Sequence, residues 1–424
     1  MSSTLSANNI HDPHSAAYKK ARKKFLKTSK NRAESSDFDW TPFRTAEKKF
    51  KARFPPPALS NVLDLAAGDP SRADEVQRGG WMGRADAVEC REIRCMDGKK
   101  AYMFDHVPGL VLLPGFISPK DQKTLVRWSL REHAKQPNET NLDAHYLIPE
   151  EGLWNVYSRQ SEEKIQPRAA TLNPDAIPEG QSGPRQLISN EPASKENYTE
   201  LLTAAKPPPV PSLTVKPTSP SDLIPKLRWA NIGWYYHWGT KQYDFTRGKI
   251  DVNEGLKEVC REAVSFVPWR ELFENDKSDW GDEINDWRIW NETYEPDAGI
   301  VNFYQTKDTL MAHVDRSEVC ATSPLVSISL GCAAVFLIGG HTRDVEPTPI
   351  LLRSGDVVIM SGPQCRRVYH GVPRILENTL PSHLEEPGED WDLFAQYLQT
   401  TRVNINVRQV FPKGFDPVID SFPS

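Results

Sequence analysis

Cysteine is scarce in this sequence, and its placement excludes two common classes of protein. The 424 residues contain six cysteines, and no two of them form a CxxC pair. The spacing of a zinc ribbon is therefore missing, and so is that of a disulfide framework. This distribution favours a reducing, intracellular compartment. We expect the nucleus or the cytoplasm, and the mitochondrion stays open.

Long apolar runs and an excess of positive charge are missing as well. The longest apolar stretch, LVSISLGCAAVFLIGG at 325–340, is shorter than the roughly 20 residues that span a bilayer. The first residues lack the apolar centre of a secretory signal, so we expect no membrane segment. A net charge of -5 excludes a wholly basic nucleic-acid binder. Any contact with nucleic acid must then use a local patch, such as the basic run at 16–32.

The C-terminal third predicts a series of short strands. The segments are AGIVNFYQ, PLVSISLG, AAVFLIGG, TPILLRSG, DVVIMSG, RRVYHGV and RVNINVRQV, separated by Gly, Pro or Ser turns. Upstream, LVLLPGF predicts a further strand, and Ser118-Pro119 begins an amphipathic helix with Leu125, Trp128 and Leu130 inward. The whole predicts a mainly β fold with flanking helices (α+β), whose core is an antiparallel sandwich or jelly roll.

Two histidines and an aspartate form a candidate metal site. His313 and Asp315 stand two apart in HVD, and His370 follows in YHGV, several strands later. In a jelly roll, strands that far apart in the chain can lie side by side. Two imidazoles and one carboxylate on one face are the ligands of non-haem iron(II) oxygenases. Zinc is the rival metal, but it normally takes a nearly closed tetrahedron.

A late strand, RVNINVR, predicts an anion site. Alternate residues of a strand share a face. Four polar residues therefore point one way: Arg402, Asn404, Asn406 and Arg408. Such a face is costly against a closed core unless an anion is bound, and arginine offers a planar fork for carboxylate. A dicarboxylate is the natural occupant, and an exposed strand face is the alternative. Asn302 and Tyr304 add polar groups just ahead of HVD.

An aromatic segment, LRWANIGWYYHWGTKQYDF at 227–245, allows two interpretations. One is an aromatic β-hairpin that packs into the core. The other is a surface that stacks a flat substrate such as a nucleobase. The orientation of Trp234, Tyr235, Tyr236 and Trp238 decides between them.

The motifs in this order resemble a known family. NFY, HVD, GGHTRD, GDVVIMSG, YHGV and RVNINVR resemble the AlkB-type iron(II)- and 2-oxoglutarate-dependent dioxygenases. The sequences HVDRSE, SGDVVIMSG and RVNINVRQV most resemble those of the AlkB homologue 1 branch. The resemblance is dense over 296–410, fainter through LLPGFIS and the aromatic segment, and absent from the N-terminal tail and the Pro-rich insertion.

The resemblance implies a role for individual residues. His313, Asp315 and His370 match the iron ligands. The residues that match the 2-oxoglutarate contacts are Asn302, Tyr304, Arg402, Asn404 and Arg408, with Arg402 at the distal carboxylate. The residues that fall where the family touches its substrate are Arg343, Trp234, Tyr235 and Tyr236. Ser317 stands where some members carry an acidic residue that reads the base. The preferred base therefore stays open.

The resemblance also implies an activity and a domain organisation. The protein would use iron(II), 2-oxoglutarate and O2 to demethylate a base in tRNA, or a single-stranded or flipped base in DNA. We expect it to be a monomer. The expected parts are an N-terminal extension, partly disordered with a basic helix (1–105), a unit with a nucleotide-recognition lid (106–157 and 223–295), a disordered Pro/Ser-rich insertion (158–222), the jelly-roll core (296–410) and a C-terminal tail (411–424).

Two other functions remain open. The same chemistry would serve an oxygenase that acts on a protein side chain or a small molecule. A jelly roll that only binds partners is the non-enzymatic alternative.

Overall fold

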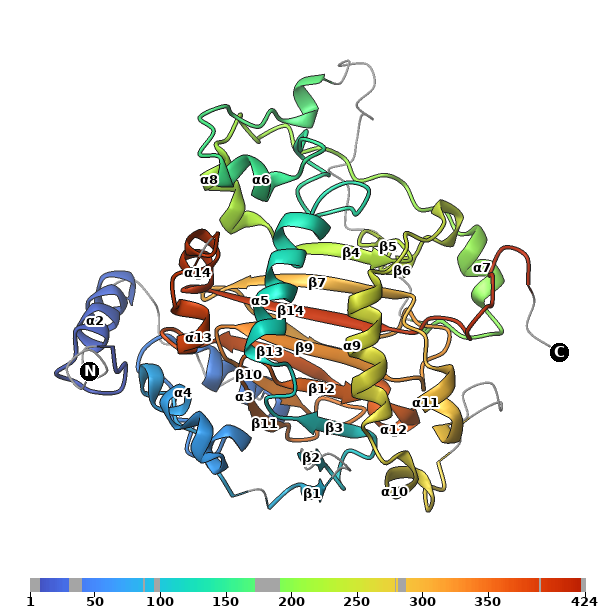
Figure 1. The fold of residues 1–424 in the computed structure, drawn as a ribbon, viewed down its shortest axis with the longest axis horizontal. Helices are drawn as coiled ribbons and strands as arrows, with labels where there is room; N and C mark the ends of the chain where they lie inside the picture. The colour runs from blue at the N-terminus through green and yellow to red at the C-terminus, as the bar shows by residue number, and fades with distance from the viewer. Residues whose placement is uncertain are drawn as a thin grey trace.

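Two antiparallel β-sheets organise the chain. The computed structural model describes residues 8–29, 40–86, 88–94, 100–171, 191–278, 280, 287–388 and 390–420. Within these ranges, no helix is both long enough and apolar enough to cross a membrane. In Figure 1 the larger sheet faces the viewer, and two helices, α5 and α9, cross its outer face.

The chain passes back and forth between the two sheets in its C-terminal part. In spatial order the larger sheet is β1 (Arg91–Arg94), β2 (Lys100–Met103), β3 (Leu110–Leu113), β12 (Val357–Met360), β9 (Leu325–Gly331), β14 (Thr401–Arg408), β7 (Ala298–Gln305) and β4 (Trp229–Gly233). The smaller sheet is β11 (Thr348–Leu352), β10 (Ala334–Ile338), β13 (His370–Ile375) and β8 (Leu310–His313). From β7 to β14 the chain crosses repeatedly between the two sheets, with only β10 and β11 consecutive in one sheet, so the predicted mainly β fold with a jelly-roll core is confirmed.

Helices cover the outside of this core. The α-helices of the described residues are α2 (Ala16–Ser29), α3 (Pro42–Lys51), α4 (Ala73–Gln77), α5 (Pro119–Arg127), α6 (Leu153–Ser158), α7 (Tyr198–Thr203), α8 (Pro220–Leu223), α9 (Glu254–Ser265), α10 (Trp269–Phe273), α11 (Trp290–Thr293), α12 (Gly362–Arg366), α13 (Ser382–Glu385) and α14 (Asp392–Leu398). A two-stranded hairpin, β5 (Tyr236–His237) with β6 (Gln242–Tyr243), follows β4.

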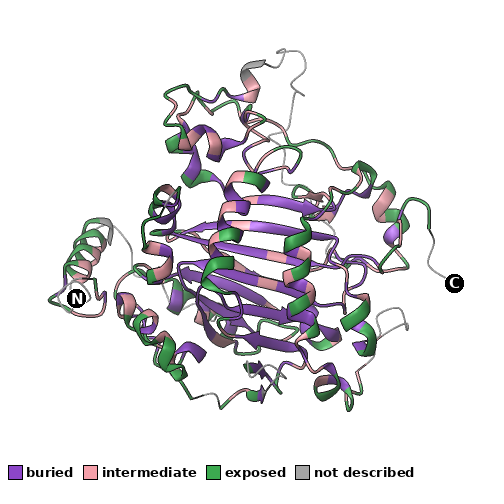
Figure 2. Cartoon of the chain, in the orientation of Figure 1, coloured by how far each residue is buried: buried purple, intermediate pink, exposed green. Residues whose placement is uncertain are grey.

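The helix α5 begins where the sequence predicts it. Ser118 caps it by accepting a hydrogen bond from the Asp121 backbone N–H at 3.2 Å, and Pro119 takes the first helical position. Leu125 and the residues predicted to face inward with it are buried in one cluster with the apolar face of the larger sheet. Figure 2 shows the same pattern, with buried strands beneath helices that are exposed on their outer side.

The strand β14 has two chemically different faces. Val403, Ile405 and Val407 point outward into the cluster beneath α5 and α9, and all three are fully buried. The alternate residues point between the sheets, as the sequence predicts, and they line the central cavity together: Arg402, Asn404, Asn406 and Arg408. The alternation thus places a polar face inside the protein.

The N-terminal extension is more integrated than predicted. Two of its strands, β1 and β2, belong to the larger sheet, so a boundary at 105 divides one sheet. The helix α3 packs on the smaller sheet through Phe43 and Phe50. The signal was weak in the sequence because β1 reads REIR, an edge strand with three charged residues out of four.

The insertion also differs from its predicted disorder. Residues 172–190 lie outside the described residues, but 191–222 carry α7 and α8. Four apolar side chains of this segment pack into a cluster with Phe411 of the C-terminal tail: Ala193, Tyr198, Leu201 and Leu202. Composition alone did not reveal this docking because only a few scattered residues provide it.

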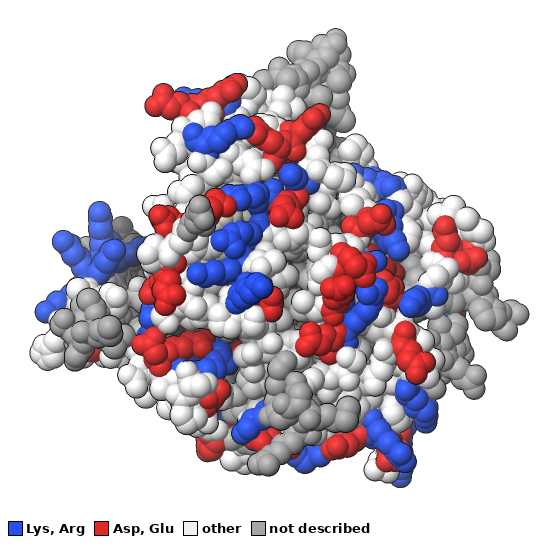
Figure 3. Space-filling model, in the orientation of Figure 1, with Lys and Arg blue, Asp and Glu red and all other residues white. Residues whose placement is uncertain are grey.

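The predicted basic helix is present over Ala16–Ser29. It carries six basic residues and no acidic one, in a chain whose net charge is -5. Figure 3 shows these Lys and Arg side chains gathered at the left, over α2. The helix is held to the rest of the protein by ring contacts between Tyr18, Phe25 and Phe54.

A buried ion pair attaches the extension to the core. The Arg353 guanidinium donates to both carboxylate oxygens of Asp64, at 3.1 and 2.7 Å, and both side chains are at most 1% exposed. Removing one partner of a buried pair leaves an uncompensated charge. We therefore expect Asp64→Ala to lower the free energy of unfolding by about 3–5 kcal/mol in chemical denaturation.

The matched control is Asp74→Ala. Asp74 pairs with Arg78 but is 61% exposed, so its loss should change the free energy of unfolding by less than about 1 kcal/mol. Equal effects of the two variants would contradict a structural role for the N-terminal extension.

Candidate active site

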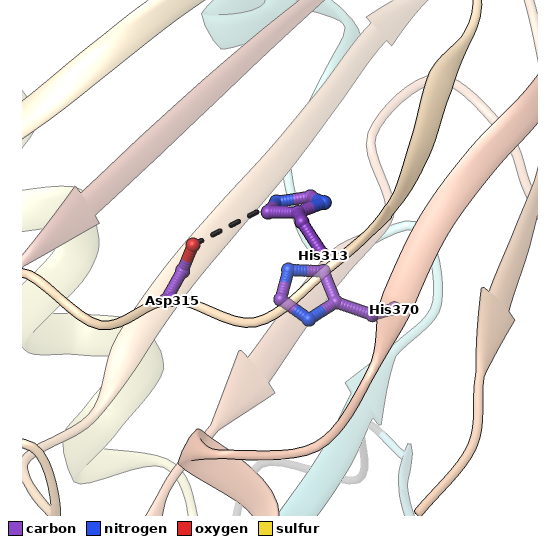
Figure 4. A group of neighbouring side chains, drawn as sticks. All are labelled: His313, Asp315 and His370. Atoms are coloured by element: carbon purple, nitrogen blue, oxygen red, sulfur yellow. Dashed lines mark ion pairs between the residues drawn. The ribbon is translucent and has the colours of Figure 1, made fainter. Parts of the chain in front are cut away.

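The three predicted metal ligands meet between two neighbouring strands. His313 ends β8, His370 begins β13, and the two are direct cross-strand partners. Asp315 follows β8 by two residues. Their ligand atoms all lie within 4.8 Å of one another, and the His313 Nε2 is 3.7 Å from an Asp315 carboxylate oxygen. Figure 4 shows the three side chains close together, with Asp315 on the loop that follows His313.

Backbone carbonyls orient both imidazoles. The Nδ1 of His313 lies 3.0 Å from the Met311 carbonyl oxygen, and the Nδ1 of His370 lies 3.1 Å from the Val368 carbonyl oxygen. A carbonyl only accepts, so each Nδ1 carries the proton and each Nε2 offers a lone pair. This is the tautomer that a histidine metal ligand needs.

The charges around the triad favour its metal-binding forms. Burial lowers the pKa of His370 to about 4, helped by the neighbouring His313. Burial opposes the ionisation of Asp315, but Arg408, His370 and His313 outweigh it and hold the pKa of that carboxyl well below its usual range. At neutral pH His370 is neutral and Asp315 is a carboxylate, which is the state a cation binds.

The triad opens into a cavity between the two sheets. Its volume is about 550 Å³, within the usual range of roughly 300–1,000 Å³ for small-molecule sites. The polar face of β14 lines it, together with Asn302 and Tyr304 of β7. The residues that the resemblance assigned to 2-oxoglutarate therefore lie in one cavity with the triad.

Arg402 is a buried cation with two unused donors. Its side chain is 1% exposed, and one nitrogen donates to the Ser329 hydroxyl at 3.0 Å. Its Nε and Nη1 have no protein partner, and its guanidinium lies 5.8 Å from the Tyr304 ring centre. Burial lowers its pKa to about 10. A guanidinium left unpaired in the interior is costly, so this end of the cavity fits a carboxylate.

Arg408, at the other end of the strand, is paired differently. It donates to Glu318 at 2.5 Å and lies 3.7 Å from the second carboxylate oxygen of Asp315. Glu318 is 1% exposed and also lies 3.7 Å from Arg366. Glu318 was not predicted from the sequence, although its place three residues after Asp315 in HVDRSE was a signal. Glu318 neutralises Arg408 and holds it beside Asp315.

The four residues predicted to touch substrate do not all reach the cavity. Arg343 lines it, donating to the Ala312 carbonyl at 3.2 Å, and so does Tyr236. Trp234 is buried against Phe245 and Phe411 instead.

Tyr235 points away from the cavity as well. Its ring lies under Arg247 at 3.7 Å, and its hydroxyl donates to the Pro137 carbonyl. The physical reason is a turn at Gly233, whose φ of +67° takes the chain out of β4 before the hairpin begins.

Trp238 lines the cavity in place of Trp234. It is 41% exposed, stacks on Trp229 at 4.8 Å, and meets Tyr236 edge to face. Among the aromatic residues at 234–238, Tyr236 and Trp238 line the cavity, whereas Trp234 and Tyr235 do not. The aromatic segment is therefore partly core and partly a wall of the site.

Comparisons with known proteins agree with this geometry. A family model described as "2OG-Fe(II) oxygenase superfamily" matches residues 189–408. The DNA N(6)-methyladenine demethylase ALKBH1A of Arabidopsis thaliana is 29% identical over 396 residues, which cover 89% of this chain and 98% of the relative. The tRNA demethylase abh1 of Schizosaccharomyces pombe is 29% identical over 378 residues, covering 87% and 96%.

A third relative shares slightly more identity over a shorter span. The nucleic acid dioxygenase ALKBH1 of Mus musculus is 30% identical over 340 residues, which cover 75% of this chain and 68% of the relative. The family match spans just over half of the chain and includes both histidines of the triad, Asp315 and all of β14. This chain therefore belongs to the 2OG-Fe(II) oxygenase superfamily.

Proposed function

We propose that this protein oxidatively demethylates a methylated nucleobase in tRNA or DNA, with iron(II), 2-oxoglutarate and O2. The observation that carries the proposal is the cavity itself, in which the triad lies with an unpaired buried guanidinium and with two aromatic side chains. The names of the relatives, which are demethylases of DNA and tRNA, support the substrate class.

In this proposal His313, Asp315 and His370 would hold the iron, because two imidazoles and one carboxylate are a donor set that suits iron(II). The Arg402 fork takes the distal carboxylate of 2-oxoglutarate, since its Nε and Nη1 have no other partner. When bound, iron(II) and 2-oxoglutarate supply the oxidation of an N-methyl group by O2, with succinate, CO2 and formaldehyde as products.

The chain's own residues prepare the site for this chemistry. Arg408 keeps Asp315 ionised, and Glu318 fixes Arg408 in place. Apolar side chains of both sheets exclude water from the rest of the cavity: Leu325, Phe336, Leu352, Val358, Met360 and Val372. A dry, preorganised site strengthens each of these electrostatic contacts.

The base has to leave its stack to reach this site. The cavity lies between two sheets, so a base inside a duplex cannot approach the triad. A single-stranded or flipped base can stack on Tyr236 or Trp238, whose rings stand at the cavity wall. The proposal thus favours single-stranded regions of tRNA, or flipped bases in DNA, as substrate.

The direct test of the activity is nucleoside mass spectrometry. Purified protein with iron(II), 2-oxoglutarate and O2 is incubated with total tRNA and with methylated single-stranded DNA. We expect one methylated nucleoside to decrease while formaldehyde and succinate form in equal amounts. Succinate formation that depends on an added protein, with no change in any nucleoside, would instead support the protein-substrate alternative.

Loss of a triad residue should remove the metal. We expect Asp315→Ala and His370→Ala to lower iron(II) binding to background in anaerobic titration, because two ligands do not hold the ion. His106→Ala, an exposed histidine far from the triad in the sequence, is the control and should bind as wild type. Full metal content and succinate production in either triad variant would refute the assignment.

Replacing Arg402 should have opposite effects on stability and on cosubstrate use. We expect Arg402→Met to raise the KM for 2-oxoglutarate at least about 30-fold, the equivalent of about 2 kcal/mol, because the carboxylate loses its fork. The same variant should stabilise the ligand-free protein by about 1–4 kcal/mol in chemical denaturation, because it removes an unpaired buried charge.

Arg402→Lys separates charge from geometry. It keeps the positive charge but not the bidentate fork, so its KM should fall between those of wild type and Arg402→Met. A Met variant with an unchanged KM and lower stability would contradict the proposed role.

Replacing Trp238 should weaken the binding of nucleic acid and leave the binding of 2-oxoglutarate unchanged. We expect Trp238→Ala to raise the KM for a methylated single-stranded oligonucleotide roughly 5- to 150-fold, because stacking is worth about 1–3 kcal/mol per base. The KM for 2-oxoglutarate should stay unchanged. Tyr235→Phe, whose ring points away from the cavity, is the control, and an equal effect of both variants would argue against stacking.

A further inference from the structure

The docked part of the insertion lies directly on the metal-binding loop. The backbone N–H of Ala193 donates to the Arg316 carbonyl at 2.7 Å. The Arg367 guanidinium bridges the two segments, donating to the carbonyls of Asp315 at 2.6 Å and Ala193 at 3.2 Å. Residues of the insertion and of the triad loop therefore share one half-buried arginine.

The helix α7 of the insertion is fixed on its other side by the C-terminal tail. Tyr198 is 7% exposed, and its ring contacts those of Phe411 and Phe415, with centres 6.4 and 6.2 Å away. Its hydroxyl donates to the Asp420 carbonyl at 3.2 Å. Side chains that pack on both sides hold α7 in one position.

The chain beyond α7 runs along the aromatic hairpin. The Nε2 of His237 lies 2.8 Å from the Pro207 carbonyl oxygen, and the Ser212 backbone N–H donates to the His145 Nδ1 at 3.2 Å. Thr218 and Ile165 then pair through their backbones. The insertion thus has anchors on both sides of α7.

Leu201 of α7 reaches the catalytic cavity. It lines the same cavity as the triad, beside Tyr236 and Tyr243, and is half-buried against the aromatic cluster. The next residue, Leu202, packs on the same cluster but does not line the cavity. The two leucines therefore form a matched pair, one in the cavity wall and one behind it.

We propose that Leu201 is a specificity-determining residue, which sets how large a base the cavity accepts. This inference rests on the proposed function. Leu201 stands in the wall that includes Tyr236, the ring on which the base would stack. An apolar wall distinguishes ligands by size, and one methylene is worth roughly 10- to 200-fold in kcat/KM. Arg367 is the positioning residue that ties this wall to the metal loop.

The experiment compares two probes that differ in ring size. Single-stranded DNA pentamers carry one N1-methyladenine, a two-ring base, or one N3-methylcytosine, a one-ring base. Formaldehyde release gives kcat/KM for each. We expect Leu201→Trp to lower the ratio of kcat/KM for the purine pentamer to kcat/KM for the pyrimidine pentamer roughly tenfold, because the larger side chain narrows the cavity. Leu201→Ala should raise the same ratio.

Two controls separate specificity from folding. Leu202→Ala and Leu202→Trp should leave the ratio as in wild type. Thermal stabilisation by 2-oxoglutarate should persist in both Leu201 variants, which shows that the cosubstrate end of the site is intact. If the wild type is active and both Leu201 variants keep its purine-to-pyrimidine ratio, the inference about Leu201 is wrong, while the proposed function stands. A wild type that releases formaldehyde from neither pentamer nor from total tRNA overturns the proposed function, and this inference with it.

Discussion

The pairing of β8 with β13 is the constraint on which the site depends. It sets His313 opposite His370, although the two are far apart in the chain. The approach is close at Gly371, where a Cβ would lie 3.0 Å from the Leu310 carbonyl oxygen and 3.2 Å from the Ala312 nitrogen. A slip of one residue in this register would turn one histidine out of the cavity.

The outer edge of β8 is held by side chains instead of another strand. Glu47 of α3 accepts from the Ala312 backbone N–H at 2.6 Å, and Arg343 donates to the Ala312 carbonyl at 3.2 Å. The backbone N–H and the carbonyl of Ala312, which precedes His313, are thus both hydrogen-bonded on the free edge of β8. The N-terminal extension therefore supports β8, the strand that ends at His313 and leads into the loop with Asp315.

The two arginines of β14 show how one polar strand face can serve two purposes. Arg408 is neutralised within the protein by Glu318, while Arg402 keeps two donors without a protein partner. In the proposed function, Arg408 keeps Asp315 ionised beside the metal, and Arg402 binds the distal carboxylate of 2-oxoglutarate. The asymmetry is physical: burying a cation without an anionic partner costs stability, and a bound carboxylate would offset that cost at Arg402.

The sequence predicted what depends on local alternation and missed what depends on distant contacts. The strands of the core, the start of α5 and the common face from Arg402 to Arg408 follow from side-chain period and capping chemistry. The pairing that joins the two histidines was expected from the fold class. The orientation of Trp234 stayed open between core and substrate surface, because it follows from the backbone at Gly233. The docking of α7 depends on a few residues that meet Phe411, a partner more than two hundred positions away.

The most direct test of the central claim is X-ray absorption spectroscopy of the iron(II)-loaded protein. The account predicts two imidazole nitrogens and one carboxylate oxygen from the protein, within a six-coordinate shell of nitrogen and oxygen completed by solvent. Scattering from a single imidazole, or from sulfur, would contradict the convergence of the two strands on one metal ion.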